Sequence, residues 1–197
     1  MHDFHDKNNI QSLLISTSPD SKMLVFLDTE FTDFAQPDLI SIGMAATGVR
    51  DFYAERSDFP RERCTSFVHA EVIPLLGRAP HAACDKYELA QRLRAWFDEL
   101  PESAIILYDF EVDWILLRAA FAGELPSKVG AHQLIDQKIF RHSAYKLGEV
   151  LIYSDAWPQH HALADAQAFQ EGYLRWKLAI EGRQWNSPSL LTDPGRI

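Results

Sequence analysis

The chain is poor in cysteine and lacks long hydrophobic runs. Of its 197 residues only Cys64 and Cys84 are cysteines, too few for a disulfide framework or a four-cysteine metal site, so we expect two reduced thiols. No apolar run approaches the ~20 residues that a membrane-spanning helix needs, and membrane insertion is not expected. Residues 1–22 lack the basic flank and continuous apolar centre of a secretory signal, which makes a cytoplasmic location the expectation.

Basic residues are also scarce. The chain has 19 lysines and arginines against 28 acidic residues, a net charge of -9, which argues against long-range, non-specific attraction to a phosphate backbone. A polyanionic substrate would need local help, either from bound cations or from residues 127–146, which hold four basic residues and one acidic residue. The same segment also fits a solvated loop and helix face, and the sequence leaves both interpretations open.

The length suits one folded domain between two peripheral ends. Residues 1–22 are polar and lack a clear period, so we interpret them as an N-terminal extension. Residues 23–182 alternate between strand-like and helix-like patterns and form the expected domain. Residues 183–197 contain Pro188, Pro194 and Gly195, which indicates a C-terminal tail.

The hydrophobic pattern of the domain predicts an α/β fold. Three apolar segments at short spacing are typical of an antiparallel meander, namely residues 23–31, 39–46 and 50–55. Strand-like and helix-like segments then alternate: a helix over 85–100, a strand over 103–108, a helix over 111–123, a shorter helix over 145–152 and a long helix over 161–182. This order favours a mixed sheet with helices on its faces.

Two carboxylates follow the apolar half of the first predicted strand, "MLVFLDTEF". Asp28 and Glu30 lie two positions apart, so on a strand their side chains project to the same side of the sheet. Like charges at such a spacing repel and lose hydration when buried, so a cation would be needed to keep both ionised. Carboxylate oxygens favour Mg²⁺ or Mn²⁺. Taken alone, the pair also fits two carboxylates that face water beyond the strand end.

Three downstream residues strengthen the metal interpretation. Asp113 stands at the head of the helix that follows the fourth predicted strand, where the helix dipole alone could also favour it. Asp165 lies among alanines that would let its helix approach the sheet closely. His160 precedes Asp165 by five positions, which is ~140° around a helix, so we place His160 in the preceding loop or first turn.

These residues resemble a known family. "FLDTEF", the helix-head Asp113 and "HHALADA" are similar, in order and separation, to the three motifs of the DEDDh 3′-to-5′ exonucleases. The H-x-A-x-x-D-A pattern, which begins at His160, is the most specific part. The segments after "DTEF" look most like the mycobacterial-type exoribonuclease branch. The resemblance covers roughly residues 23–180 and implies a ribonuclease H-like fold with a roughly five-stranded mixed sheet.

The resemblance also implies roles for the matched residues. Asp28, Glu30 and Asp165 would hold one metal ion, Asp28 would be shared with a second, and Asp113 would assist the second ion, largely through water. His160 would be the general base. Two Mg²⁺ or Mn²⁺ ions would support in-line displacement at phosphorus and release of nucleoside 5′-monophosphates from a 3′ end.

One position departs from the family pattern, and contacts to the substrate are less defined. Many relatives have asparagine four residues before the second-motif aspartate, where this chain has Asp109. Asp109 could accept a hydrogen bond, but it adds negative charge beside the route that the substrate phosphates would follow. By the same resemblance Phe31 and Leu39 would contact terminal bases, while a core role for each is the alternative. His161 is interpreted as a surface residue or as one that supports His160.

We therefore expect a metal-dependent 3′-to-5′ exonuclease acting on single-stranded nucleic acid, with RNA favoured over DNA. A DNA-directed exonuclease and a catalytically inactive nucleic-acid or protein-binding module on the same fold are the alternatives. A zinc hydrolase using His160, His161 and nearby acids is a third, but it lacks the helical histidine spacing of such enzymes. Relatives are often dimers, and the aromatic content permits a homodimer.

Overall fold

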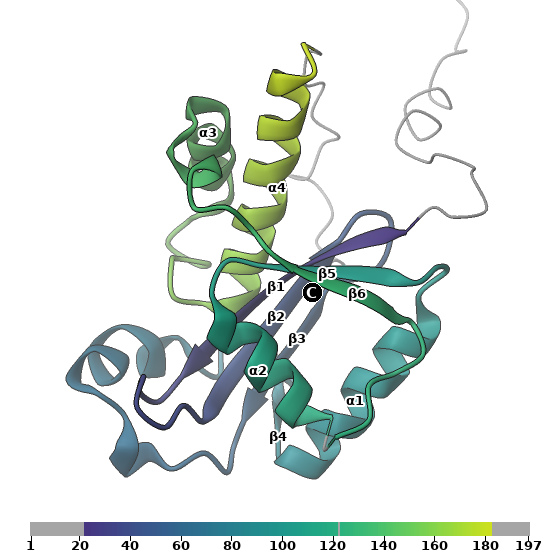
Figure 1. The fold of residues 1–197 in the computed structure, drawn as a ribbon. Coiled ribbons are helices and arrows are strands. Elements are labelled where there is room, and N and C mark those ends of the chain that lie inside the picture. The colour runs from purple at the N-terminus through teal and green to yellow at the C-terminus, as the bar shows by residue number, and fades with distance from the viewer. Residues whose placement is uncertain (1–21, 122, 183–197) are drawn as a thin grey trace, which may run out of the picture.

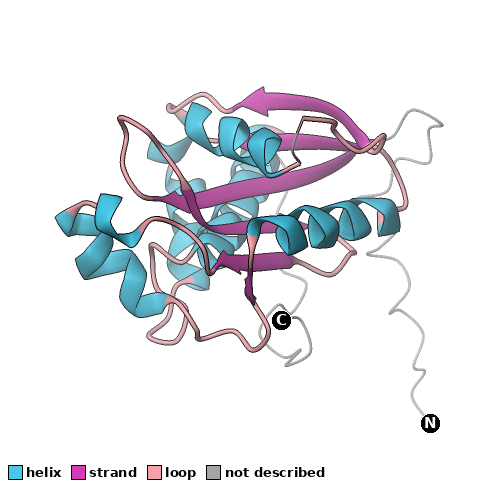
Figure 2. Cartoon of the chain, turned by 90° about the horizontal axis from the view of Figure 1, so that it is seen from below, coloured by secondary structure: helices cyan, strands magenta, loops and turns pink. Residues whose placement is uncertain are grey.

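The computed structural model describes residues 22–121 and 123–182. The predicted N-terminal extension, apart from Lys22, and the predicted C-terminal tail at 183–197 lie outside the described residues. The described chain forms one mixed sheet with helices packed on both of its faces (Figures 1 and 2). This α/β arrangement confirms the predicted fold class and is compatible with a ribonuclease H-like fold.

The sheet has six strands in the order β4-β3-β2-β1-β5-β6. β1 (Met23–Phe31), β2 (Leu39–Ala46) and β3 (Phe52–Arg56) form the predicted antiparallel meander. β5 (Ala104–Tyr108) then pairs with β1 in parallel. Because helices cover both faces, β2 is almost continuously apolar rather than alternating, and all eight of its residues are buried.

The sheet has six strands where roughly five are expected, and the two strands without a counterpart among the predicted segments are both edge strands. β4 (Ala83–Cys84) has only two residues and pairs with β3. β6 (Val129–Leu134) pairs in parallel with β5 and lies within the segment interpreted as a loop and helix face. Four of the six β6 residues are exposed, because this strand lies at the sheet edge and buries little side-chain surface. Its sequence, "VGAHQL", therefore carries little hydrophobic signal.

All four predicted helices are present. They are α1 (Lys86–Glu99), α2 (Glu111–Ala120), α3 (Ser143–Ile152) and α4 (Ala162–Ile180). The α1 start follows from capping, because the Asp85 carboxylate accepts hydrogen bonds from the backbone N–H groups of Tyr87 and Glu88. Short helical turns occur at Arg61–Arg63, Val68–Val72, Ile73–Leu75 and Ile139–Arg141.

The strand alternation divides the core between the two faces. Leu27 packs in a cluster with residues of α1 and α2, whereas Phe26 packs against Phe169 of α4. The Phe26 and Phe169 rings meet edge to face with centroids 5.1 Å apart. α1 and α2 therefore cover one face of the sheet, and α4 covers the other with α3 packed on it.

Glycines allow two unusually close backbone approaches. A Cβ atom placed on Gly43 of β2 would lie 2.3 Å from the carbonyl oxygen of Ala162, so only glycine lets the start of α4 rest on the sheet. A Cβ atom on Gly148 of α3 would lie 2.5 Å from the backbone nitrogen of Gly172 on α4. The alanines around Asp165 permit the close helix-sheet contact that the sequence predicts. None of the described helices combines the length and apolarity needed to cross a membrane.

Candidate active site

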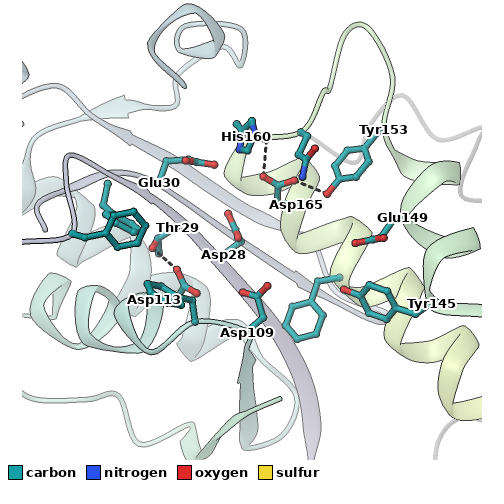
Figure 3. A pocket seen from close by; sticks show the side chains of 15 residues that line it. Asp28, Thr29, Glu30, Asp109, Asp113, Tyr145, Glu149, Tyr153, His160 and Asp165 are labelled. Carbon is teal, nitrogen blue, oxygen red and sulfur yellow. Dashed lines mark hydrogen bonds between the residues drawn. The ribbon is translucent and has the colours of Figure 1, made fainter. Parts of the chain in front are cut away.

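The candidate site lies where β1 extends beyond its pairing with β5. Only Met23–Phe26 of β1 pairs with Ala104–Leu107 of β5, so the following residues of β1 lose their neighbour on that side. The chain of β5 turns at Asp109 and enters α2. Because β1 and β5 are parallel, their carboxyl ends meet at the same edge. The sheet topology therefore brings Asp28 and Glu30 beside Asp109 and Asp113 (Figure 3).

Asp113 is held in place by a strand residue. Its side chain is 2% exposed, and its Oδ1 atom accepts a hydrogen bond of 2.6 Å from the Thr29 hydroxyl. Thr29 alternates with Asp28 and Glu30 on β1 and so projects toward α2, as the strand period requires. This threonine fixes the orientation of the Asp113 carboxylate at the head of α2.

His160 and Asp165 enter the site from the start of α4. His160 lies in the loop before this helix, as predicted, with a left-handed backbone φ of 68°. Its backbone N–H donates to Asp165 Oδ2 at 2.9 Å, and the Tyr153 hydroxyl donates to Asp165 Oδ1 at 2.7 Å. The approach of α4 to Gly43 matters here, because Gly43 is the β2 residue paired with Asp28.

The side chains enclose an acidic pocket of about 330 Å³. Its lining includes six carboxylates and, within the described chain, no lysine or arginine; the carboxylates are Asp28, Glu30, Asp109, Asp113, Glu149 and Asp165. None of the four basic residues of the 127–146 segment lines it. Lys146 reaches it indirectly, through an ion pair of 2.7 Å with Glu149. The chain itself therefore supplies little positive charge to this cavity.

Burial and mutual repulsion raise the pKa values of the four predicted acidic ligands. Burial, followed by the neighbouring carboxylates, holds the pKa of Asp28 well above its ordinary range. The same causes raise the pKa of Glu30 to about 8. Burial raises the pKa of Asp113 to about 7 against the opposing Thr29 hydrogen bond. It raises the pKa of Asp165 to about 6 against the hydrogen bonds from Tyr153 and His160.

The donor set fits divalent cations. The Oδ2 atoms of Asp28 and Asp113 are buried and lack a hydrogen-bond partner, although a buried carboxylate oxygen normally has one. One ligand atom each from Glu30, His160 and Asp165 lies within 4.8 Å of the others. The carboxylate oxygens among these atoms suit Mg²⁺ or Mn²⁺, and a bound cation would both neutralise the repulsion and satisfy the orphaned oxygens.

His161 does not belong to the pocket. Its ring is 1% exposed and lies between Tyr53, stacked at 4.4 Å, and Trp157, edge-on at 4.6 Å. Burial lowers the pKa of His161 to about 4, so the ring is neutral at physiological pH. The prediction of a surface position is wrong, and the zinc hydrolase that uses both histidines loses one of its ligands.

The predicted substrate contacts have different placements. Phe31 and Asp109 line the pocket, and burial raises the pKa of Asp109. Leu39 is 3% exposed and packs in the core cluster of the α1 and α2 face, so it is not available to a substrate in this structure. The physical reason is that Leu39 opens β2, whose side chains are covered on both faces of the sheet.

Sequence reasoning misses eight of the residues that line the pocket, and four of these bear most on its chemistry. Phe34 and Phe110 form an aromatic cluster with Phe31, and Tyr153 and Glu149 approach from the end of α3. A local signal exists only for Phe110, which lies between the end of β5 at Tyr108 and the start of α2. The others lie in loops or on α3. The sequence pattern of α3 shows that the helix has an apolar face, but it does not show where the helix packs relative to the sheet.

Comparison with known proteins gives a partial similarity to two curated relatives. No family profile matches the chain. A protein named 3′-5′ exoribonuclease from Mycobacterium tuberculosis is 36% identical over 78 residues in strain CDC 1551, and the same figures hold for strain H37Rv. The aligned part is 39% of this chain and 45% of the curated relatives. This similarity supports a nuclease, and therefore a hydrolytic enzyme.

Proposed function

We propose that this protein is a DEDDh-type, metal-dependent 3′-to-5′ exoribonuclease. The observation that carries the proposal is the convergence of Asp28, Glu30, Asp113, His160 and Asp165, from separate parts of the chain, on one acidic pocket. The name of the mycobacterial relatives supports the reaction class and the choice of RNA. The substrate is the 3′ end of a single strand, and the products are nucleoside 5′-monophosphates.

The acidic residues account for the metal requirement. Asp28, Glu30 and Asp165 would hold one Mg²⁺ or Mn²⁺ ion, and Asp28 with Asp113 would hold a second. When bound, such ions stabilise the attacking and leaving oxygens of a displacement at phosphorus. The chain has a net charge of -9, and a polyanion would be repelled by a cavity that contains six carboxylates. The positive charge of the bound ions would offset this repulsion.

His160 is the proton acceptor in this proposal. Its loop position places the imidazole at the rim of the pocket, within 4.8 Å of ligand atoms of Glu30 and Asp165. Its ring meets the Phe67 ring edge to face, with centroids 5.0 Å apart and planes at 87°. The backbone hydrogen bond to Asp165 holds the histidine loop against the acidic cluster. An imidazole nitrogen held there can accept the proton of an attacking water.

Three phenylalanines favour a single-stranded substrate. Phe34 is 73% exposed and Phe110 is 44% exposed, although aromatic side chains of this size are usually covered. Phe31 and Phe110 are nearly parallel with centroids 6.4 Å apart, and Phe34 meets both edge-on. Exposed aromatic faces beside a phosphate-handling pocket can stack on unpaired bases, whereas bases within a duplex are already stacked.

The chemical identity of the first product released from RNA tests the proposed reaction. A single-stranded RNA labelled in its 3′-terminal nucleotide is incubated with protein and Mg²⁺, and the products are separated by chromatography. We expect the label to appear first as a nucleoside 5′-monophosphate. Label in longer fragments, in a nucleoside without phosphate, or only in intact RNA under varied metal and pH would refute the proposal.

The same assay decides the substrate class. RNA, single-stranded DNA and duplexes with or without 3′ overhangs are compared at equal concentrations. The proposal expects single-stranded RNA to be degraded fastest and a blunt duplex to be resistant. Faster degradation of DNA would replace the exoribonuclease with the DNA-directed alternative while leaving the active-site assignment intact.

A further inference from the structure

Tyr153 makes the only side-chain hydrogen bond to Asp165 among the described residues. It lies just beyond α3, whose last residue is Ile152, in an extended backbone conformation. From there its ring reaches over the start of α4, and its hydroxyl donates to Asp165 Oδ1 at 2.7 Å. Figure 3 shows the two side chains facing each other across the upper wall of the pocket. None of the motifs that predict the active site includes this tyrosine.

The two donors leave Asp165 able to bind a cation. Tyr153 occupies one lone pair of Oδ1, and the His160 backbone N–H occupies one lone pair of Oδ2. A carboxylate offers about four lone-pair sites, so each oxygen keeps one for a metal ion. With one donor on each oxygen, the plane of the carboxylate is fixed, and its free lone pairs have a defined direction. Groups that orient a ligand in this way commonly raise metal affinity.

The packing of α3 on α4 sets the position of the backbone that carries Tyr153. Gly148 of α3 approaches the backbone of Gly172 so closely that a Cβ atom would lie 2.5 Å from its nitrogen. A Cβ atom on Gly172 would in turn lie 2.8 Å from the ring of Tyr145. These contacts hold α3 against α4 and so fix where α3 ends, directly before Tyr153.

We propose that Tyr153 is a positioning residue for the metal site: through its hydrogen bond to Asp165, it sets the affinity for the divalent cation. The inference rests on the proposed function, because it assumes that Asp165 is a metal ligand. It gives the end of α3 an indirect part in the chemistry, although α3 contributes none of the five predicted catalytic residues. Tyr153 itself touches neither the reacting atoms nor the substrate in this role.

Manganese binding without substrate tests the role. Free Mn²⁺ is followed by electron paramagnetic resonance during titration of wild type, Tyr153→Phe, Tyr173→Phe and Asp28→Asn. Tyr173 is the matched control, because it is a half-buried tyrosine of α4 that does not line the pocket. We expect Tyr153→Phe to weaken Mn²⁺ binding about 10-fold or more, the usual effect of losing such a partner, and Tyr173→Phe to leave it within about twofold.

The metal dependence of RNA cleavage separates positioning from a purely structural role. Positioning predicts that Tyr153→Phe needs about 10-fold more Mn²⁺ for half-maximal rate but regains at least a third of the wild-type rate at saturation. A structural role would lower the saturated rate and the melting temperature in EDTA without this shift. Tyr153→Leu is a second hydroxyl-free variant if Tyr153→Phe does not fold.

The outcomes for the two proposals are distinguishable. Unchanged Mn²⁺ affinity in folded Tyr153→Phe, together with lost affinity in Asp28→Asn, overturns the role of Tyr153 and leaves the metal site standing. If wild type does not bind Mn²⁺, or if Asp28→Asn binds it equally well, the metal site and the role of Tyr153 are both refuted.

Discussion

At the residue scale, the site concentrates negative charge that the protein alone cannot stabilise. The carboxylates of Asp28 and Asp113 each have a buried oxygen without a hydrogen-bond partner. Two hydroxyls, those of Thr29 and Tyr153, and the His160 backbone N–H donate hydrogen bonds to Asp113 and Asp165. With the Lys146 ammonium on Glu149, these donors serve a pocket of six carboxylates. Repulsion between the carboxylates therefore lowers the stability of the folded protein when no cation is bound.

The first prediction at the residue scale concerns how the stability of the metal-free protein depends on pH. The folded-state pKa values of Glu30, Asp113 and Asp165 are raised to about 8, 7 and 6, whereas unfolded carboxyls titrate near ~4. The folded state thus holds protons that the unfolded state releases, so stability is greatest at low pH and falls as pH rises from about 4 to 8. Melting in EDTA should show a decrease of about 5 °C or more between pH 5 and pH 8.

The matched control for this pH effect is the double variant Asp28→Asn with Glu30→Gln. It removes two of the mutually repelling carboxyls and should flatten the pH dependence in EDTA. Saturating Mn²⁺ should raise the melting temperature of wild type at pH 8 back to its value at low pH. A melting temperature of wild type in EDTA that stays level or rises over this interval would contradict the electrostatic description of the pocket.

The second prediction at this scale concerns the role of His160 as proton acceptor. Because a positioned proton acceptor contributes about 10² to 10⁴ to a rate, His160→Ala should lower kcat by that factor while changing KM for RNA little. His69→Ala is the control, because His69 is exposed on the short helix at Val68–Val72 and does not line the pocket. Rates are measured at saturating Mg²⁺ with melting curves in parallel. A kcat within threefold of wild type would remove His160 from the chemistry.

The third prediction at this scale concerns the exposed aromatic cluster of Phe31, Phe34 and Phe110. Stacking on one base is worth ~1 to 3 kcal/mol, so Phe34→Ala or Phe110→Ala should raise KM for single-stranded RNA about 5-fold to 100-fold. The change in kcat should be smaller, since these rings are proposed to contact bases and not the reacting phosphate. Steady-state kinetics on a short RNA give both constants, and Tyr87→Ala, a 70% exposed aromatic of α1, serves as control. An unchanged KM in both phenylalanine variants would exclude base stacking there.

At the element scale, the site depends on how closely α4 approaches the sheet. Gly43 of β2 lies beside Asp28 in the strand register and under Ala162 at the start of α4. The contact sets the distance from β1 to Asp165, and the Gly148 and Gly172 contact then places α3 with Tyr153. Two helix packings built on glycine therefore determine where one acidic ligand and its hydrogen-bond partner lie.

Gly43→Ala should disrupt both stability and metal binding. Its Cβ atom would lie 2.3 Å from a backbone oxygen of Ala162, which cannot yield as a flexible side chain could, so α4 must shift. We expect a loss of about 1 to 3 kcal/mol in the free energy of unfolding, the usual cost of overpacking, and weaker Mn²⁺ binding. Chemical denaturation and Mn²⁺ titration measure the two effects.

Gly130→Ala is the matched control for this substitution. It also adds a Cβ atom to a strand glycine, but on the edge strand β6, where the nearest atom is a side-chain carbon of Ser103 at 3.2 Å. Gly130→Ala should cost less stability and leave Mn²⁺ affinity unchanged. Equal stability of the Gly43→Ala and wild-type proteins would show that α4 does not rest on β2 as described.

The elements also show which parts of the fold the sequence could predict. β1, β2 and α1 bury continuous or periodic apolar side chains and carry clear boundaries such as the Asp85 cap, so their patterns suffice. β6 is an exposed edge strand, and its existence depends on pairing with β5 rather than on its own composition. Tyr153 and Phe34 reach the pocket only through tertiary packing, for which a single sequence contains no local signal.

At the scale of the whole molecule, an acidic protein is proposed to handle an acidic polymer. The net charge of -9 provides no general attraction to RNA, and the six pocket carboxylates add local repulsion. Recognition must then rest on bound cations and on aromatic contacts, both short-range. The five predicted site residues could be placed from sequence because each lies near a strand end or helix start, and the parallel pairing of β1 with β5 brings such ends together.

The most direct test of this account compares wild type with Asp28→Asn on a single-stranded RNA labelled at its 5′ end. The substitution keeps the size of the side chain but removes the charge at the centre of the acidic cluster. With Mg²⁺, wild type should produce a ladder that shortens from the 3′ end, whereas wild type in EDTA and Asp28→Asn in Mg²⁺ should leave the RNA intact. Intact RNA with wild type and Mg²⁺, or an equal ladder from folded Asp28→Asn, would contradict the account.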